Sequence, residues 1–371
     1  MRILALVTDA FGGHGGIALY NRDFLTGLCE MNESSEVVAL PRLMPNPPEP
    51  LPDKLTWNLD GLGGKPHYFR ALLALLAHDR KFDLVVCGHI NLLPAAWLAK
   101  KVTGAQLLLE IYGIDAWRPT KSWLANRLVH QCQAVTSISS VTRDRFLEWA
   151  KVDQGKMHLL PNAIHPDWYG LGPKPDYLIN RYRLLGKKVL MTLGRLVEKE
   201  RYKGFDEVLE ILTELPKDVS YLIVGDGSDR ARLEVKVQQL GVADRVVFAG
   251  LIPESEKADH YRLADLYVMP SRGEGFGFVF LEALACGIPC IGSTEDGSRE
   301  ALREGALGQL IDPGEPETLR RAILDGLQQG RGKVPDGLAY FSFANFTLRL
   351  ETIIRTVLEE GSKRWSKTFL L

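Results

Sequence analysis

Short apolar runs recur along the chain, and polar or amphipathic stretches of helical length separate them. Apolar runs that are bounded by glycine, proline or serine are typical of strands buried on both faces. The runs that we predict as strands are Ile3–Val7, Glu36–Leu40, Leu84–Cys87, Ala105–Glu110, Ala134–Ile138, Met157–Leu160, Val189–Leu193, Tyr221–Val224, Val246–Ala249 and Leu266–Met269. Strands that alternate with helices predict parallel sheets covered by helices on both sides, the doubly wound α/β class.

The alternating pattern occurs twice, once on each side of a stretch that contains Pro173 and Pro175. At 371 residues the chain is long enough for two domains of ordinary size. We therefore predict an N-terminal domain over residues 1–168, a second domain over residues 169–343, and a final helical segment over residues 344–371.

Composition narrows the functional classes. The chain is 46% apolar and 25% charged with a net charge of −1, as in a globular protein without the basic bias of nucleic-acid binders. The apolar start Ile3–Val7 is too short for a signal-peptide core, and no apolar run reaches the length of a membrane span. Five cysteines without a CxxC pair indicate reduced thiols and no metal site. The leucine-rich stretch Tyr68–His78 predicts an amphipathic helix that faces the core or, alternatively, a membrane surface.

A glycine cluster, Gly12–Gly16, follows the first predicted strand and precedes a helical pattern. In doubly wound folds such a turn lies where ligands bind. Gly13, Gly15 and Ala18 fit the dinucleotide fingerprint G-x-G-x-x-A, so an NAD(P)-dependent oxidoreductase is one alternative. The second predicted strand is followed by proline and arginine, however, without the acidic residue that would bind the ribose of NAD.

A second glycine-rich turn lies between Ser271 and Pro289, in the sequence SRGEGFGFVFLEALACGIP. Residues 277–286 predict a short helix, and a helix that begins at a glycine turn offers free N–H groups to an anion. Glu274 precedes this helix, and Glu282 lies about 6 Å along the axis from its first turn. Each carboxylate alone would pass for an ordinary solvated charge. Together, around an anion site, they indicate a sugar joined to phosphate.

Two basic residues, Arg195 and Lys203, follow the predicted strand Val189–Leu193. A guanidinium fork and an ammonium point charge can together neutralise a diphosphate. Taken alone, both residues would be unremarkable surface charges.

These features together resemble the retaining glycosyltransferases of family 4. The spacing of Glu274 and Glu282 is similar to the E-x7-E signature of that family, and Gly194-Arg195 followed by Lys203 is similar to its GR-x(n)-KG pattern. The resemblance implies the GT-B fold, in which two Rossmann-like domains face each other across a cleft. It also implies that the last helix crosses back onto the first domain.

The resemblance further implies roles for single residues. Glu274 would contact the transferred sugar, while Arg195 and Lys203 would stabilise the leaving diphosphate, so these three are the predicted catalytic residues. The predicted donor-binding residues are Gly15, Gly16, Gly194, Ile252, Gly275, Phe276, Gly277, Phe278, Val279 and Glu282. Among them Glu282 would bind the ribose hydroxyls, and Ile252 would lie beside the base.

One position departs from the family pattern. The family usually has histidine where this chain has Tyr112, in the sequence EIYGIDAW. A phenol can donate to a sugar hydroxyl, so Tyr112 and His14 are predicted to contact the sugar or the acceptor. Because a phenol differs from imidazole in reach and in pKa, the choice of sugar stays open. A donor-binding protein without transfer activity is a further alternative.

The principal hypothesis is a retaining hexosyltransferase that uses a nucleoside diphosphate sugar, with UDP-glucose first. The acceptor would be a hydroxyl of a glycan, a polysaccharide or a lipid-linked sugar. GDP-mannose is the alternative donor, because Glu254 could accept from a guanine N–H edge. The chain contains no Asp-X-Asp sequence, so we predict transfer without a metal ion or other cofactor. We expect a cytoplasmic protein without a nucleic-acid partner, and peripheral association with the inner face of the plasma membrane as an alternative location.

Overall fold

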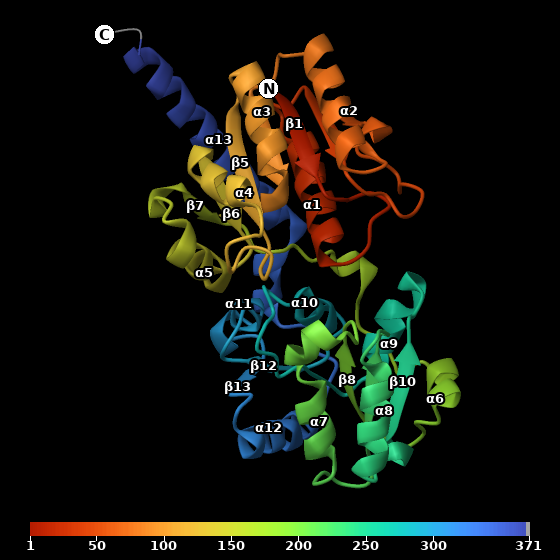
Figure 1. Ribbon diagram of the computed structural model, residues 1–371. Coiled ribbons are helices and arrows are strands. Elements are labelled where there is room, and N and C mark those ends of the chain that lie inside the picture. The colour runs from red at the N-terminus through yellow and green to blue at the C-terminus, as the bar shows by residue number, and fades with distance from the viewer. Residues whose placement is uncertain (369–371) are drawn as a thin grey trace. The chain divides into compact units, whose positions relative to one another are not determined.

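The computed structural model describes residues 1–368, with side chains described through residue 359. It divides into two compact units (Figure 1). Unit 1 comprises Met1–Ala163 together with the C-terminal stretch that begins at Phe343, and unit 2 comprises Ile164–Ser342. Ile164 is bridged to Ser342, so the two points at which the chain enters and leaves unit 2 lie side by side.

Unit 1 contains a seven-stranded sheet with the strand order β3-β2-β1-β4-β5-β6-β7. Its strands are β1 (Arg2–Val7), β2 (Glu36–Pro41), β3 (Leu55–Trp57), β4 (Leu84–Gly88), β5 (Gln106–Ile111), β6 (Ala134–Ser137) and β7 (Met157–Leu159). Its helices are α1 (Gly16–Glu30), α2 (Lys65–His78), α3 (Leu93–Thr103), α4 (Trp123–Leu128), α5 (Ser140–Ala150) and α13 (Phe343–Thr368). Every pairing in the sheet is parallel.

Unit 2 contains a six-stranded sheet with the order β10-β9-β8-β11-β12-β13, again parallel throughout. Its strands are β8 (Lys188–Leu193), β9 (Val219–Val224), β10 (Val246–Gly250), β11 (Leu266–Val268), β12 (Cys290–Ser293) and β13 (Gln309–Ile311). Its helices are α6 (Asp176–Tyr182), α7 (Phe205–Leu212), α8 (Arg230–Gln239), α9 (Lys257–Leu263), α10 (Phe278–Ala285), α11 (Ser298–Ala301) and α12 (Pro316–Gln329).

The α/β class with two Rossmann-like parallel sheets, predicted from the alternating pattern, is thus confirmed. Three short strands were not predicted: β3, β12 and β13. β3 and β13 are edge strands of three residues each, too short for a recognisable alternation of apolar and polar positions. β12 begins at Cys290, directly after a helix end and a proline, where the sequence reads as a turn.

Helix α13 packs on α1 within unit 1. The Phe346 ring lies 5.7 Å from the Tyr20 ring in an edge-to-face contact. A Cβ atom on Gly27 would come within 2.9 Å of the Leu350 side chain, so glycine at this position lets the two helices approach closely. The final helix therefore completes the hydrophobic core of unit 1.

Helix α2 is the leucine-rich amphipathic segment. Its buried residues Tyr68, Ala71, Leu72 and Leu76 lie on one face and belong to the core of unit 1. The apolar face of α2 therefore packs against the core of unit 1. Among the helices that the structure describes, none is long and apolar enough to cross a membrane.

The strand orders identify one special position in each sheet. In unit 1 the chain builds outward from β1 to β3 and then continues from β4 on the other side of β1. In unit 2 it does the same from β8 to β10 and then from β11. Ligands of doubly wound sheets bind at the carboxyl ends of the strands where the order reverses. In unit 2 these are the ends of β8 and β11.

Candidate functional site

The two strand ends at the reversal point of unit 2 carry the predicted catalytic residues. β8 ends at Leu193, directly before Gly194 and Arg195, and β11 ends at Val268, six residues before Glu274. The two strands are neighbours, with Leu266 paired to Leu190. The fold therefore brings together two motifs that are about eighty residues apart in the sequence.

Glu274 is held in place through its backbone. Its N–H donates to the Asp296 carboxylate over 2.8 Å, and its carbonyl accepts from Gly297 over 2.9 Å. Asp296 is fully buried and also accepts a hydrogen bond of 2.7 Å from the Ser271 hydroxyl. Burial raises the pKa of Asp296, while hydrogen bonds from Ser298 and Ser271 act in the opposite direction. Asp296 thus fixes the loop that carries Glu274.

Helix α10 begins where this loop ends. Gly277 precedes the helix with a φ of 88°, and a Cβ atom there would lie 2.6 Å from the Phe280 ring. The position therefore requires glycine for its backbone conformation and for space. The first N–H groups of a helix have no partner within the helix, so Phe278 and Val279 offer donors to an anion beside Glu274.

The predicted cations are paired with carboxylates. The Lys203 ammonium donates to Glu274, and both side chains are mostly buried, at 13% and 15% exposure. Arg195 is 77% exposed and donates to Glu200, whose other carboxylate oxygen lies 3.8 Å from the Lys203 ammonium. Glu200 therefore lies between the two cations. The sequence offered no signal for it, because it belongs to an ordinary charged stretch, EKERYK.

Glu282 is in a different environment. Its side chain is completely buried and accepts hydrogen bonds from three donors. Tyr169 and Lys257 donate to Oε1 over 2.7 and 2.5 Å, and Tyr261 donates to Oε2 over 2.6 Å. Burial favours the neutral amine of Lys257, but the charges and hydrogen bonds of Glu282 and Glu254 together outweigh this and raise the pKa of the lysine. The interpretation of Glu282 as a solvated helix-surface charge is therefore wrong.

Ile252 lies in the loop after β10, in a partly exposed position next to Leu251, which is 82% exposed. This loop adjoins the Glu282 environment through a shared lysine. The Lys257 ammonium lies 3.3 Å from the Glu254 carboxylate and 2.5 Å from that of Glu282. Lys257 thus links Glu254, two residues after Ile252, to the predicted ribose-binding residue Glu282.

Gly275 and Phe276 belong to the loop of Glu274 in unit 2, whereas four further predicted residues lie in unit 1. His14, Gly15 and Gly16 follow β1 at the start of α1, and His14 is exposed with Nε2 2.7 Å from the amide of Asn46. A Cβ atom on Gly15 or Gly16 would meet nothing within 4 Å, so this turn faces open space. The structure describes this group within unit 1 and the Glu274 group within unit 2.

Tyr112 follows β5 and points into the core of unit 1. It is 6% exposed, and its hydroxyl lies 2.7 Å from Asn21 Oδ1 and 3.0 Å from the Gly88 carbonyl. The buried carboxylate of Glu110 is 3.3 Å away. In this structure the Tyr112 hydroxyl, predicted to contact the sugar, makes its hydrogen bonds to protein groups instead. Neither Asn21 nor Glu110 was identified from the sequence, since single polar residues in apolar elements carry no motif.

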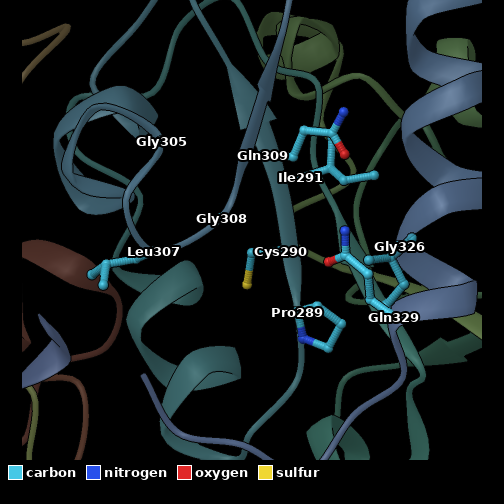
Figure 2. A pocket seen from close by; sticks show the side chains of 10 residues that line it. Pro289, Cys290, Ile291, Gly305, Leu307, Gly308, Gln309, Gly326 and Gln329 are labelled. Atoms are coloured by element: carbon cyan, nitrogen blue, oxygen red, sulfur yellow. The ribbon is translucent and has the colours of Figure 1, made fainter. Parts of the chain in front are cut away.

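A pocket in unit 2 has a lining that includes none of the predicted site residues (Figure 2). It is lined by Pro289, Cys290 and Gln309, at the amino ends of β12 and β13, and by Gly326 and Gln329 of α12. Ligands of doubly wound folds bind at the carboxyl ends, so this pocket does not coincide with the candidate site.

Within the part of the chain that the structure describes, no three His, Cys, Asp or Glu side chains are placed to hold a metal ion.

Comparison with known proteins agrees with this arrangement. Residues 14–168 match the family described as Glycosyltransferase Family 4, and residues 180–335 match the family described as Glycosyl transferases group 1. Together the two matches cover most of the chain. Solved structures show the same fold: HepE of Anabaena in complex with UDP and glucose aligns over 98% of this chain and 100% of its own, with a TM-score of 0.72 and 20% identity. The chain therefore belongs to the group 1 glycosyltransferases of the GT-B type.

Two curated relatives illustrate the range within this group. The GDP-mannose-dependent alpha-(1-6)-phosphatidylinositol monomannoside mannosyltransferase of Mycolicibacterium smegmatis is 30% identical over 65% of this chain and 66% of its own length. The 2-deoxystreptamine N-acetyl-D-glucosaminyltransferase of Streptomyces fradiae is 27% identical over 75% of this chain and 71% of its own. The chain spans about two thirds of the length of these relatives.

Proposed function

We propose that this chain transfers a hexose from a nucleoside diphosphate sugar to an acceptor hydroxyl, with retention of the anomeric configuration and without a metal ion. The observation that carries the proposal is the position of Glu274. Glu274 lies in the loop that precedes α10, its carboxylate is paired with Lys203, and its backbone N–H donates to Asp296. A sugar diphosphate needs a carboxylate that accepts hydrogen bonds from the sugar hydroxyls, and beside it a cluster of groups that bind the phosphates.

In the proposed mechanism the diphosphate lies against Lys203, Arg195 and the first N–H groups of α10. Breaking the bond between the anomeric carbon and the phosphate oxygen loads negative charge on the β-phosphate. Fixed cations and helix N–H groups stabilise this charge as it develops. Glu274 accepts hydrogen bonds from the transferred sugar and orients it. The acceptor oxygen attacks the same face that the phosphate leaves, and the departing phosphate takes the acceptor proton.

A covalent route would require a carboxylate on the far face of the sugar. Glu274 is the only carboxylate near the phosphate-binding groups that the sequence marks for this role. Its ion pair with Lys203 supports the binding role instead, because Lys203 is also a proposed diphosphate ligand. The predicted independence of metal is tested by assaying turnover in excess EDTA, where full activity is expected. Activity that is lost with EDTA and restored by Mn²⁺ would contradict this prediction.

The donor has two candidates. UDP-glucose is the prediction from the sequence. GDP-mannose is the second candidate, favoured by the names of mycobacterial relatives. The position of Glu254 does not favour guanine over uracil, because its carboxylate is 82% exposed and lies 3.3 Å from the Lys257 ammonium. Competition calorimetry with UDP and GDP decides between the two, since a tighter GDP complex would overturn the choice of UDP.

The acceptor we propose is a glycan, a polysaccharide or a lipid-linked sugar, which would place the protein at the cytoplasmic side of a membrane.

Two alternative functions predict different ligands or products from those of a glycosyltransferase. An oxidoreductase would bind NAD(P) through the Gly12–Gly16 turn, whereas no acidic residue follows β2 to hold its ribose. A donor-binding protein without activity would bind the nucleotide sugar but release no nucleoside diphosphate. A coupled assay for that release, with simple glycosides as acceptors, separates it from the enzyme.

A further inference from the structure

The Glu282 carboxylate is already occupied by protein donors. Oε1 accepts from Tyr169 and Lys257, and Oε2 accepts from Tyr261. A carboxylate has about four acceptor positions in all, and this one has no exposed surface. A ribose hydroxyl can therefore reach Glu282 only if one of the three donors moves away.

Two of the donors are poorly suited to move. Tyr261 is completely buried, and its ring packs against that of Tyr267 at 5.9 Å. Lys257 supplies the positive charge that compensates the buried carboxylate, and removing such a partner is strongly unfavourable. Tyr169 remains. Its hydroxyl is a neutral donor, and a ribose hydroxyl would replace it with a bond of the same kind.

The surroundings of Tyr169 allow its side chain to move alone. The residue is partly exposed and follows the short 3-10 turn Pro166–Trp168. Its carbonyl and that of Gly170 both accept from the Arg262 guanidinium, over 3.3 and 2.9 Å. The backbone is therefore tied to α9, whereas the partly exposed ring is held by the hydrogen bond to Glu282 and by one edge-to-face contact with the Tyr261 ring, at 6.3 Å. Rotation of the side chain would uncover Oε1 without unfolding the segment.

We propose that Tyr169 is a gate on the ribose site, in which its hydroxyl holds Glu282 until a ribose hydroxyl displaces it. This inference rests on the proposed function, since it assumes that Glu282 binds the ribose. It adds a specificity-determining residue: only ligands with ribose hydroxyls compensate Glu282 for the lost tyrosine. The segment that carries the gate begins next to Ile164, where the chain enters unit 2.

The first test compares two matched variants by calorimetry, Tyr169→Phe and Tyr261→Phe, because both remove one hydroxyl from the same carboxylate. The ligands are UDP and GDP, each beside its 2′,3′-dideoxy form. Tyr169→Phe should bind the ribose nucleotide about tenfold more tightly, since its competitor is gone, and should bind the dideoxy form unchanged. Tyr261→Phe should show no gain. Unchanged or weaker binding by Tyr169→Phe, or an equal gain for the dideoxy nucleotide, would overturn the gate.

The second test uses the unmodified protein. Burial and the charge of Glu282 raise the pKa of the Tyr169 phenol, and a released side chain would lose both effects. Nitration by tetranitromethane, mapped by mass spectrometry, should therefore increase at Tyr169 when UDP or GDP is added, and stay absent at Tyr261. Protection of Tyr169 by the nucleotide would refute the gate. A protein that binds neither nucleotide would refute the proposed function and the gate with it, whereas nucleotide binding without either effect would refute the gate alone.

Discussion

Glu274 and Glu282 are eight residues apart, and each is paired with its own lysine, yet their environments differ. Glu274 lies on a loop, is 15% exposed, and has the Lys203 ammonium as its side-chain partner. Glu282 lies on α10, is completely buried, and is bound by Lys257 and two tyrosine hydroxyls. Equal formal charge and equal pairing therefore produce one carboxylate that can exchange its lysine and one that has to keep it.

The function of a motif carboxylate thus depends on which protein partner has to leave before a ligand can bind. At Glu274 the lysine can turn to a phosphate while the carboxylate turns to a sugar, so both charges stay satisfied. At Glu282 the lysine has to stay, because an isolated charge in that position would be severely destabilising.

The largest effect is expected in stability. Replacing Lys257 by Met should lower the free energy of unfolding by about 3–5 kcal/mol, because Glu282 would be left buried without a cation. Lys203→Met is the matched control and should lose about 1 kcal/mol, since Glu274 can turn toward solvent. Urea unfolding of the two variants measures both values. Equal losses would show that the two ion pairs are equivalent after all.

The second prediction concerns turnover. Glu274→Gln should lower kcat by about 100-fold through lost orientation of the sugar, and leave UDP or GDP affinity nearly intact. Glu282→Gln should instead weaken the nucleoside diphosphate about tenfold and raise the donor KM to match.

Steady-state kinetics and calorimetry of the two variants test this division, with the exposed Glu317→Gln in α12 as control. Identical profiles for Glu274→Gln and Glu282→Gln would contradict the assignment of separate roles.

The third prediction uses Glu110, a buried carboxyl group of unit 1 that accepts from the Tyr112 hydroxyl. Burial raises its pKa from 4.5 to about 8, with a weaker opposing effect from the Tyr112 hydroxyl. Between these two values the unfolded chain releases this proton while the folded protein keeps it. The contribution of Glu110 to the free energy of unfolding should therefore be fully present below pH 4.5. It should fall by up to about 1.4 kcal/mol per pH unit as the pH rises toward 8.

The measurement is urea unfolding from pH 5 to pH 8 of the unmodified protein and of Glu110→Gln, which is neutral throughout. Asp115, whose pKa is raised to about 7 by burial, is present in both proteins and cancels in the difference. Parallel stability curves for the two proteins would show that Glu110 does not titrate in this range.

The smallest effect is expected at Glu200, the carboxylate between Arg195 and Lys203. A diphosphate would have to displace it, so Glu200→Gln should tighten UDP or GDP binding by about two- to fivefold, as expected for a pair with an exposed arginine. Glu198→Gln, with a side chain that is 77% exposed, is the neighbouring control. Weaker binding by Glu200→Gln would mean that this carboxylate supports the site.

The loop residues of the candidate site could be predicted because they lie in contiguous patterns. Glycine turns, helix starts and the eight-residue spacings are local features, and strand ends of parallel sheets meet at one edge. The residues that hold them could not be predicted. Asp296 follows Glu274 by 22 residues, in the loop after the unpredicted strand β12. Tyr169 precedes Glu282 by 113 residues, in a segment without periodic structure.

The class of fold and the order of most strands and helices could be predicted from the sequence alone, which also suggested the side chains of the candidate site. These properties depend on hydrophobic periodicity and on turn residues, which act over short stretches of chain. The packing of the folded chain, in contrast, buries Glu282, leaves Glu274 partly exposed and turns Tyr112 inward. Burial and hydrogen-bond partners come from elements far apart in the chain, and they decide which polar groups remain free to meet a ligand.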